Sequence, residues 1–270
     1  MIIWLSLVIL TCAFSALYTV IANINGLNDW FIILWLILGL LTATILLVLW
    51  LLCLIYIIMP KCKPGSKFMQ KLVWPWIDFV NQLCRMHITI EGKENIPNDT
   101  FVIFANHKSM LDITILYEAI NRPISAIAKK ELSNVPVLKT LCKSLKVQFV
   151  DRENDREAVK GLLQAIKYVS GGLNYFIFPE GGIKSRETEL MIDLRPGAYK
   201  LATKPRAVIL PTSIIGSSKL ATNAFKKRTD IKVIFHKPIY PEEYETFNTH
   251  EIGEHVGKII NDGVENAQKK

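Results

Sequence analysis

Residues 101–112 have the sequence FVIFANHKSMLD, in which a short apolar run is followed directly by polar residues. The run Phe101–Phe104 is apolar, bounded and partly β-branched, which is typical of a buried strand. His107 and Asp112 follow it, and a histidine held by a carboxylate can take a proton from a hydroxyl near neutral pH. No serine, cysteine or lysine nucleophile is obvious beside them, so the hydroxyl could belong to a substrate.

Ser109 and Asp112 also fit a capping box, in which Ser109 caps a helix and Asp112 reaches back to its first turn. The two interpretations are compatible. Residues five apart in an unbroken helix lie about 140° apart around its axis and cannot meet. If the helix begins at Ser109, His107 lies in the preceding turn and can fold back toward Asp112.

Residues 1–60 contain no Lys or Arg and a single acid, Asp29. Two apolar runs fill them, and a membrane-spanning helix needs roughly 20 apolar residues. We therefore expect a transmembrane hairpin with helices at about 2–22 and 30–59, joined by a polar turn at 23–29. A cleaved signal peptide is the alternative for the first run, although that run lacks a basic start and a clear small-x-small cleavage site.

Basic residues crowd the end of the second apolar run, at Lys61, Lys63, Lys67 and Lys71. The positive-inside rule then predicts an integral protein of the cell (inner or plasma) membrane, with the following domain in the cytoplasm and the turn outside. Residues 61–87 mix lysines with aromatic and aliphatic residues, which favours amphipathic helices at the membrane interface, broken near Pro75. The alternative is that these helices pack on the domain core.

Strands and helices alternate through residues 88–270. The expected strands are 88–90, 101–104, 124–128, 145–150, 175–178, 207–215 and 231–235, and the expected helices are 135–142, 154–169 and 251–266. This alternation predicts an α/β fold with a mixed, largely parallel sheet flanked by helices. Ligands of such sheets collect at the carboxyl ends of the strands, so we expect His107, Asp151-Arg152 and Glu180-Gly181 to share one site.

All 32 Lys and Arg residues lie in residues 61–270, and the whole chain carries a net charge of +8. A dispersed positive charge suits anionic lipid headgroups or phosphorylated substrates. Nucleic acid is not expected as a partner, because no nucleic-acid-binding motif accompanies the charge. The histidines of the HEIGEH stretch at 250–255 miss both common zinc spacings, so no metal site is expected.

Four ordered blocks between residues 88 and 214 resemble those of the 1-acylglycerol-3-phosphate acyltransferases, also called lysophosphatidate acyltransferases. The family's Asn-His-x-Ser-x-x-Asp is matched by residues 106–112, and its Phe-Ile/Val-Asp-Arg by 149–152. Its third block, Phe-Pro-Glu-Gly-Thr-Arg-Ser, is matched by 178–181. There the chain departs: Gly182 replaces the threonine, and the arginine is either Ile183 or, with one inserted residue, Lys184. Residues 195–198 resemble the basic-x-Gly-Ala that follows, and 210–212 the fourth block.

The resemblance implies that residues 88–270 form an acyltransferase domain. His107 would be the general base on the sn-2 hydroxyl of a lysophosphatidate, and Asp112 would orient it and stabilise the imidazolium. The acyl donor would be a thioester, either acyl-CoA or acyl-carrier protein, and the product phosphatidic acid for phospholipid synthesis. No metal or redox cofactor is implied.

The expected substrate-binding residues are Asn106, Ser109, Arg152, Glu180, Gly181, Gly182, Lys184 and Arg186. Arg152 and Lys184 are expected to bind the acceptor phosphate, with Arg186 as the next choice for the role of Lys184. Within this set Glu180 is expected to hold a basic residue or the loop backbone, since a carboxylate repels a phosphate.

Two alternatives remain open at this point. The same chemistry could act on another acceptor, such as a different lysophospholipid, glycerol 3-phosphate or an amino-acid lipid. The chain could also be a non-catalytic, basic, membrane-anchored module that binds anionic lipid.

Overall fold

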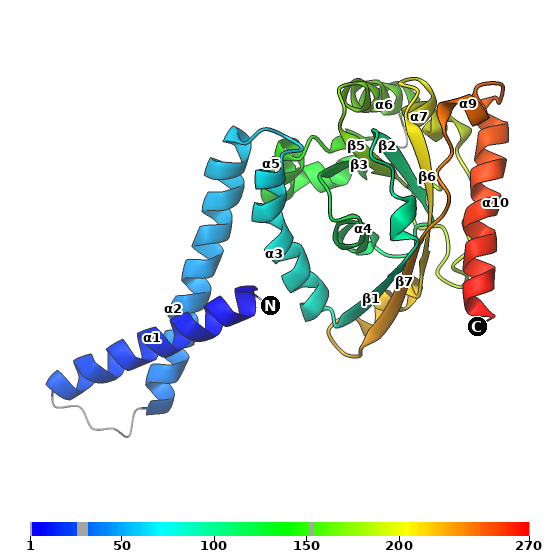
Figure 1. Cartoon of the computed structure of the whole chain (residues 1–270). Coiled ribbons are helices and arrows are strands. Elements are labelled where there is room, and N and C mark those ends of the chain that lie inside the picture. Colours follow the sequence, from blue (N-terminus) through cyan, green and yellow to red (C-terminus); the bar gives the residue numbers. More distant parts are fainter. Residues whose placement is uncertain (1, 26–31, 152–153, 270) are drawn as a thin grey trace. The chain divides into compact units, whose positions relative to one another are not determined.

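The computed structural model describes residues 2–25, 32–151 and 154–269 (Figure 1). It consists of two compact units, Met1–Lys61 and Cys62–Lys270, and each is considered by itself. Most of the predicted polar turn lies outside the described residues, as does Arg152.

The first unit is a pair of packed helices, α1 (Ile2–Ile24) and α2 (Ile32–Cys53). A π-helical turn and a 3-10 turn continue the second helix as far as Lys61. The helices approach closely at Gly39, where an added Cβ would lie 2.8 Å from the Thr11 carbonyl oxygen. Tyr18 and Thr42 share a 2.7 Å hydrogen bond. Both helices are long and apolar enough to cross a membrane, over residues 2–24 and 33–61.

A seven-stranded sheet forms the centre of the second unit. Its strands are β1 (Met86–Glu91), β2 (Phe101–Ala105), β3 (Ile124–Lys129), β4 (Gln148–Val150), β5 (Asn174–Ile177), β6 (Val208–Ile215) and β7 (Thr229–Phe235). They lie in the order β1-β7-β6-β2-β5-β3-β4. Every neighbouring pair is parallel except β6 and β7. The predicted mixed, largely parallel sheet is therefore confirmed.

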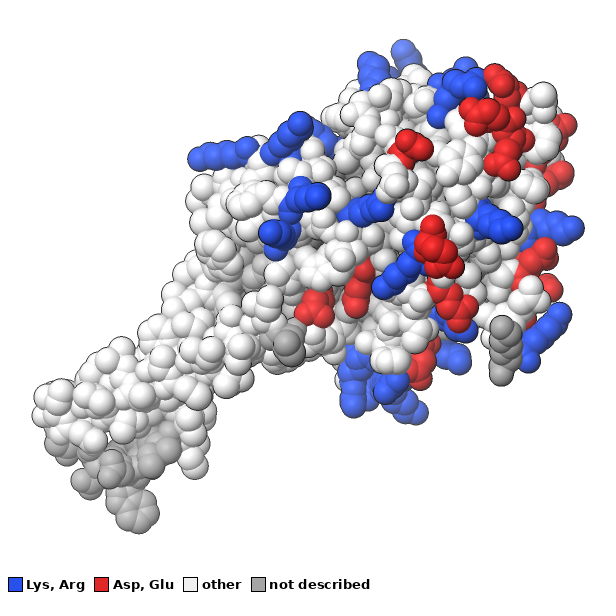
Figure 2. Space-filling model, viewed as in Figure 1, with Lys and Arg blue, Asp and Glu red and all other residues white. Residues whose placement is uncertain are grey.

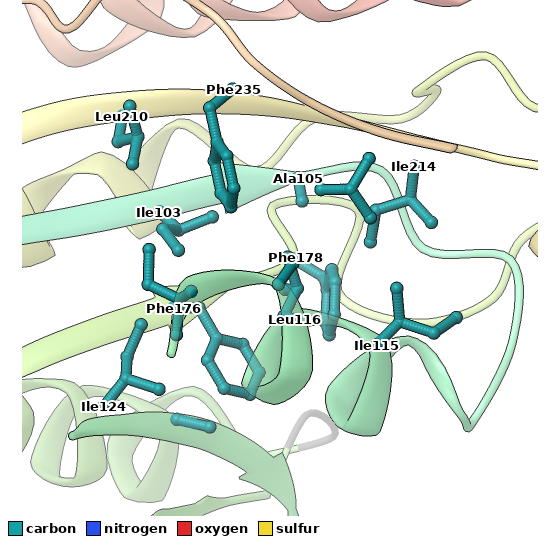
Figure 3. Close-up of a cluster of buried hydrophobic side chains, with 14 of the residues drawn as sticks. Ile103, Ala105, Ile115, Leu116, Ile124, Phe176, Phe178, Leu210, Ile214 and Phe235 are labelled. Atoms are coloured by element: carbon teal, nitrogen blue, oxygen red, sulfur yellow. The ribbon is translucent and has the colours of Figure 1, made fainter. Parts of the chain in front are cut away.

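Helices cover both faces of this sheet. They are α3 (Lys67–Leu83), α4 (Asp112–Ile120), α5 (Pro136–Ser144), α6 (Asp155–Ser170), α7 (Lys200–Thr203), α8 (Leu220–Asn223), α9 (Pro241–Tyr244) and α10 (Thr249–Gln268). Alternate residues of β2 point to opposite faces, as a strand requires. Ile103 packs with Ile115 and Leu116 of α4 (Figure 3). Phe104 packs on the other face, in the cluster that contains residues of α6, α7 and α10.

Helix α3 is one continuous helix, so the predicted break near Pro75 is wrong. A proline inside a helix removes one backbone hydrogen bond, but most helix stability in proteins comes from packing an apolar face. Here Met69 and Val73 are buried, and the Asn81 side chain donates to Glu118 of α4. The helix belongs to the same compact unit as the sheet.

The parallel strands β2, β5, β3 and β4 are consecutive in the sheet, so their carboxyl ends lie at one edge. We call it the carboxyl edge. The first and third sequence blocks begin directly after β2 and β5, and the second block spans the end of β4. The fold thus places all three blocks along the carboxyl edge, in the position where open α/β sheets bind ligands.

Candidate active site

His107 and Asp112 form a hydrogen-bonded pair at the end of β2. The His107 Nδ1 atom lies 2.9 Å from Asp112 Oδ2. The Asp112 side chain is fully buried, and that of His107 is 12% exposed. An ionised carboxylate only accepts hydrogen bonds, so Nδ1 carries the proton of a neutral imidazole. The lone pair then sits on Nε2, which is the nitrogen available as a base.

The same carboxylate oxygen also organises the loop that carries the histidine. Asp112 Oδ2 accepts the backbone N–H groups of Lys108 at 2.8 Å and Ser109 at 2.9 Å. Asp112 thus reaches back to the preceding turn, as a capping box predicts, and holds the imidazole at the same time.

The helix begins at Asp112 itself and not at Ser109. The Ser109 hydroxyl accepts from the Leu111 N–H, two residues on, at 3.2 Å. A hydrogen bond to the N–H two residues on closes a tight turn. A helix-capping serine would instead accept the N–H three residues on. The predicted helix start is therefore three residues too early, although His107 does lie in the turn that precedes the helix.

The imidazole also has an aromatic support from the third block. The rings of His107 and Phe178 are stacked, with centroids 4.1 Å apart and planes 8° apart. Phe178 follows β5, the neighbour of β2 in the sheet. Two adjacent strands therefore fix both the plane of the histidine and its hydrogen-bond direction.

Glu180 is bound by two residues of the first block, His107 and Lys108. Its Oε1 accepts the His107 backbone N–H at 2.8 Å, and its Oε2 lies 3.0 Å from Lys108 Nζ. Both Glu180 and Lys108 side chains are fully buried. The expectation that Glu180 holds a basic residue is met, and Lys108 is a site residue that the sequence reasoning missed.

Asn106 and Ser109 are buried and hydrogen-bonded within the protein. The Asn106 side-chain amide donates to the carbonyl oxygens of Glu189 and Ile214, and its Oδ1 accepts from the Ile214 N–H. Since these contacts and the Ser109 turn use their polar groups, we infer that both residues shape the site instead of facing the substrate. Glu180, whose carboxylate is bound by His107 and Lys108, also shapes the site.

The cations expected to bind phosphate differ in their surroundings. Lys184 and Arg186 are both exposed, and Lys184 Nζ lies 3.0 Å from Asp193. Another cation, Arg195, lies over the glycine turn of the third block: a Cβ on Gly181 would meet its guanidinium Nε at 2.5 Å. Gly181 has φ +70°, a conformation that glycine adopts freely. A larger residue at Gly181 would therefore both strain the turn and displace Arg195.

A further cation marks the end of β3. Lys130 Nζ lies 3.0 Å from Asp151 of the second block, and this hydrogen bond raises the pKa of Lys130. The contact links the second block to the neighbouring strand at the carboxyl edge. Lys130 is not part of any block, so the sequence reasoning did not single it out.

A cavity of about 260 Å³ opens beside the third block. Apolar side chains of β3, β4 and α6 line it, including Ile127, Val150 and Leu162, together with Phe178 and Pro179. Arg195 is the one charged residue among the described residues of its wall. Elsewhere, His250 pairs with Glu254 and His255 packs on Phe247, so these two histidines make separate contacts.

Comparisons with known proteins agree with this geometry. A family model described as Acyltransferase matches residues 87–215. A probable 1-acyl-sn-glycerol-3-phosphate acyltransferase from Mycoplasma genitalium is 31% identical over 190 residues, 65% of this chain and 69% of that protein. The 1-acyl-sn-glycerol-3-phosphate acyltransferase of Saccharomyces cerevisiae is 29% identical over 178 residues, 64% of this chain and 57% of the yeast protein.

The fold also has a solved counterpart. The crystal structure of the 1-acyl-sn-glycerophosphate acyltransferase PlsC from Thermotoga maritima matches with a TM-score of 0.63 at 22% identity, covering 84% of this chain and 96% of that one. The match to the Acyltransferase model, together with the mixed sheet, places the chain among the α/β acyltransferases. Within that class the chain belongs to the 1-acyl-sn-glycerol-3-phosphate acyltransferase family.

Proposed function

We propose that this protein transfers a fatty acyl group from a thioester, acyl-CoA or acyl-carrier protein, to the sn-2 hydroxyl of 1-acylglycerol 3-phosphate. The product is phosphatidic acid. The observation that carries this proposal is the His107–Asp112 pair, in which Nε2 is the free base. Among the described residues, the imidazole hydrogen-bonds to a carboxylate and stacks on a phenyl ring, and no protein hydroxyl or thiol forms a hydrogen bond with it. The substrate then supplies the nucleophile.

The reaction follows from that arrangement. His107 Nε2 takes the proton of the acceptor hydroxyl as its oxygen attacks the thioester carbonyl, and Asp112 stabilises the imidazolium that forms. When the carbon–sulfur bond breaks, the same imidazolium returns its proton to the departing thiolate. An ester and a free thiol result, and the histidine is again neutral.

The test of this function is thiol release by the purified protein in lipid vesicles. We expect release with an acyl thioester and lysophosphatidate, with one phosphatidic acid formed per thiol. A panel of lysophosphatidylcholine, glycerol 3-phosphate and an N-acyl amino acid should react more slowly. If one of these reacts faster than lysophosphatidate, that compound is the preferred acceptor. If no acceptor gives thiol release, the protein is a non-catalytic lipid-binding module.

The acceptor phosphate is proposed to lie against two cations, Lys184 of the third block and Arg195 of the segment that follows it, with Arg152 and Arg186 as further contributors. Lys184 stands nearest in sequence to the position of the family's arginine. Arg195 lies against the Gly181 backbone in the same loop. Guanidinium groups bind phosphate through paired N–H donors, whereas a lysine offers a point charge.

We expect Lys184→Gln and Arg195→Gln each to raise the KM for lysophosphatidate about tenfold, since a hydrogen bond to a charged group is worth about 1.5–3 kcal/mol. The KM for uncharged monoacylglycerol and for the thioester should not change. Lys204→Gln, at an exposed lysine outside these blocks, is the matched control. If Lys184→Gln keeps the wild-type preference for the phosphorylated acceptor, Lys184 is not a phosphate ligand.

We also propose that α1 and α2 anchor the protein in the cell membrane, with residues 61–270 in the cytoplasm. The lysines that follow Met59 support this orientation. Over the second unit, Lys and Arg side chains are interspersed with acids on the face shown in Figure 2. Such a surface is compatible with a nearby layer of anionic headgroups.

Cysteine labelling of intact cells tests the orientation. In a background free of native cysteines, a cysteine at Asn25 should react with an impermeant maleimide from outside. A cysteine at Lys269 should react only after the membrane is permeabilised. The reverse pattern would invert the orientation, and cleavage near Ala22 in the mature protein would replace the hairpin with a signal peptide and one span.

A further inference from the structure

Two buried carboxylates bind three consecutive residues of the first block. Asp112 accepts from the His107 ring and from the N–H groups of Lys108 and Ser109. Glu180 accepts from the remaining N–H, that of His107, and from the Lys108 ammonium. Every backbone N–H of residues 107–109 therefore ends on a carboxylate oxygen, which satisfies donors that water does not reach.

Lys108 is the unusual member of this cluster. Its side chain is fully buried, although lysine is almost never fully buried unless it is paired. Its ammonium lies 3.0 Å from Glu180, which is fully buried as well. Neither charge faces solvent, so the pair is not a surface contact that salt would screen. Direct attack of the acceptor hydroxyl on the thioester needs the imidazolium of His107 but no second buried cation.

The charge balance around the imidazole explains the role of the Lys108–Glu180 pair. With Lys108 protonated, the charge of Glu180 is cancelled, and Asp112 is left as the carboxylate that balances the imidazolium. Among the described residues, Glu189 touches the first block through its carbonyl, which accepts from Asn106, while its carboxylate accepts from the Gly216 N–H and Ser218. Arg195 lies over Gly181. Without Lys108, the negative charge of Glu180 would be unbalanced beside the His107 peptide. This second buried negative charge would stabilise the protonated form of the imidazole.

We propose that the buried Lys108–Glu180 pair is a positioning device for the catalytic histidine. Glu180 fixes the His107 peptide to the third block, and Lys108 neutralises Glu180 so that Asp112 alone sets the charge around the ring. The proposal rests on the proposed function in one respect: His107 is the general base. It assigns to Lys108 a role in the reaction without contact with the substrate.

The test is a cycle of three variants in the full-length protein in vesicles. Lys108→Met and Glu180→Gln each leave one buried charge unpaired, and each should lower kcat about 100-fold with little change in KM, as small misplacements of reacting groups do. Lys108→Met/Glu180→Gln removes both charges, while the glutamine oxygen can still accept the His107 N–H. The double variant should recover kcat to within about tenfold of wild type.

The pH dependence separates positioning from simple stability. Lys108→Met should raise the pH at which half of kcat/KM is lost on the acid side, because an extra negative charge favours the imidazolium. Glu180→Gln should lower that pH, and the double variant should restore it. Carbethoxylation of His107, followed by mass spectrometry across pH, should show the same shifts without any substrate. If wild type transfers no acyl group, the proposed function fails, yet this readout still tests the pair.

The control is the exposed Arg206–Glu245 pair, at 2.6 Å, whose double glutamine variant should match wild type in all readouts. If the single variants do not fold, the double variant alone decides. A folded double variant with wild-type pH dependence and near-wild-type kcat supports the proposal. A folded double variant with kcat as low as 1% of wild type, or single variants that share the wild-type acid midpoint, would overturn it.

Discussion

Replacing His107 by alanine is expected to lower acyl transfer by about 10²–10⁴-fold, the range that general acid–base catalysis typically contributes. The upper end is expected here, because one imidazole both accepts the acceptor's proton and returns it to the thiolate. The fold should survive, since the backbone N–H of an alanine can still donate to Glu180.

Thiol release and circular dichroism of the variant in vesicles check both parts of this expectation. His250→Ala is the matched control, because His250 also contacts a carboxylate, Glu254, at 3.3 Å, but on the exposed face of α10. It should leave kcat unchanged. Turnover close to wild type in His107→Ala would show that another group takes the proton.

Asp112→Asn should lower kcat by about 10²–10⁴-fold while the protein stays folded. An amide in place of the carboxylate cannot stabilise the imidazolium or hold the tautomer in the same way. Its oxygen can still accept the N–H groups of Lys108 and Ser109. Its nitrogen would take the place of Oδ1, which is buried and has no hydrogen-bond partner among the described residues. A buried amide group without an acceptor would lower the stability of the variant by about 1–3 kcal/mol.

A helix cap outside the active site is the control that separates the catalytic role of Asp112 from its structural role. Asn248 caps α10 by accepting the N–H groups of His250 and Glu251. Asn248→Ala should lose about 1 kcal/mol of stability with kcat unchanged. If kcat of Asp112→Asn, corrected for the folded fraction, equals that of wild type, Asp112 is only a helix cap.

Local pattern was enough to predict most of the sheet. Strand β2 is a continuous apolar run because a central parallel strand is buried on both faces. The pairing of His107 with Asp112 was also predictable, since they lie five positions apart and a turn brings them together. The order of the strands is not encoded in any single segment, but their alternation with helices already placed three blocks at one edge.

Contacts between distant segments were not predictable in the same way. Lys108 and Glu180 are 72 residues apart, and a lysine in a polar loop gives no sign that it will be fully buried. The pairing of Lys184 with Asp193 depends on the path of an irregular loop, which no periodicity describes. The start of α4 shifted because the Ser109 hydroxyl closes a two-residue turn, a choice that propensity alone does not decide.

Direct attack by the substrate hydroxyl can be separated from a covalent acyl-enzyme by one measurement. Purified protein is mixed with an acyl thioester in vesicles that contain no acceptor, and free thiol is followed from the first milliseconds. Because the acceptor itself supplies the nucleophile, we expect no thiol burst until lysophosphatidate is added, and steady release thereafter. A burst of one thiol per protein molecule without acceptor would contradict the mechanism proposed for this site.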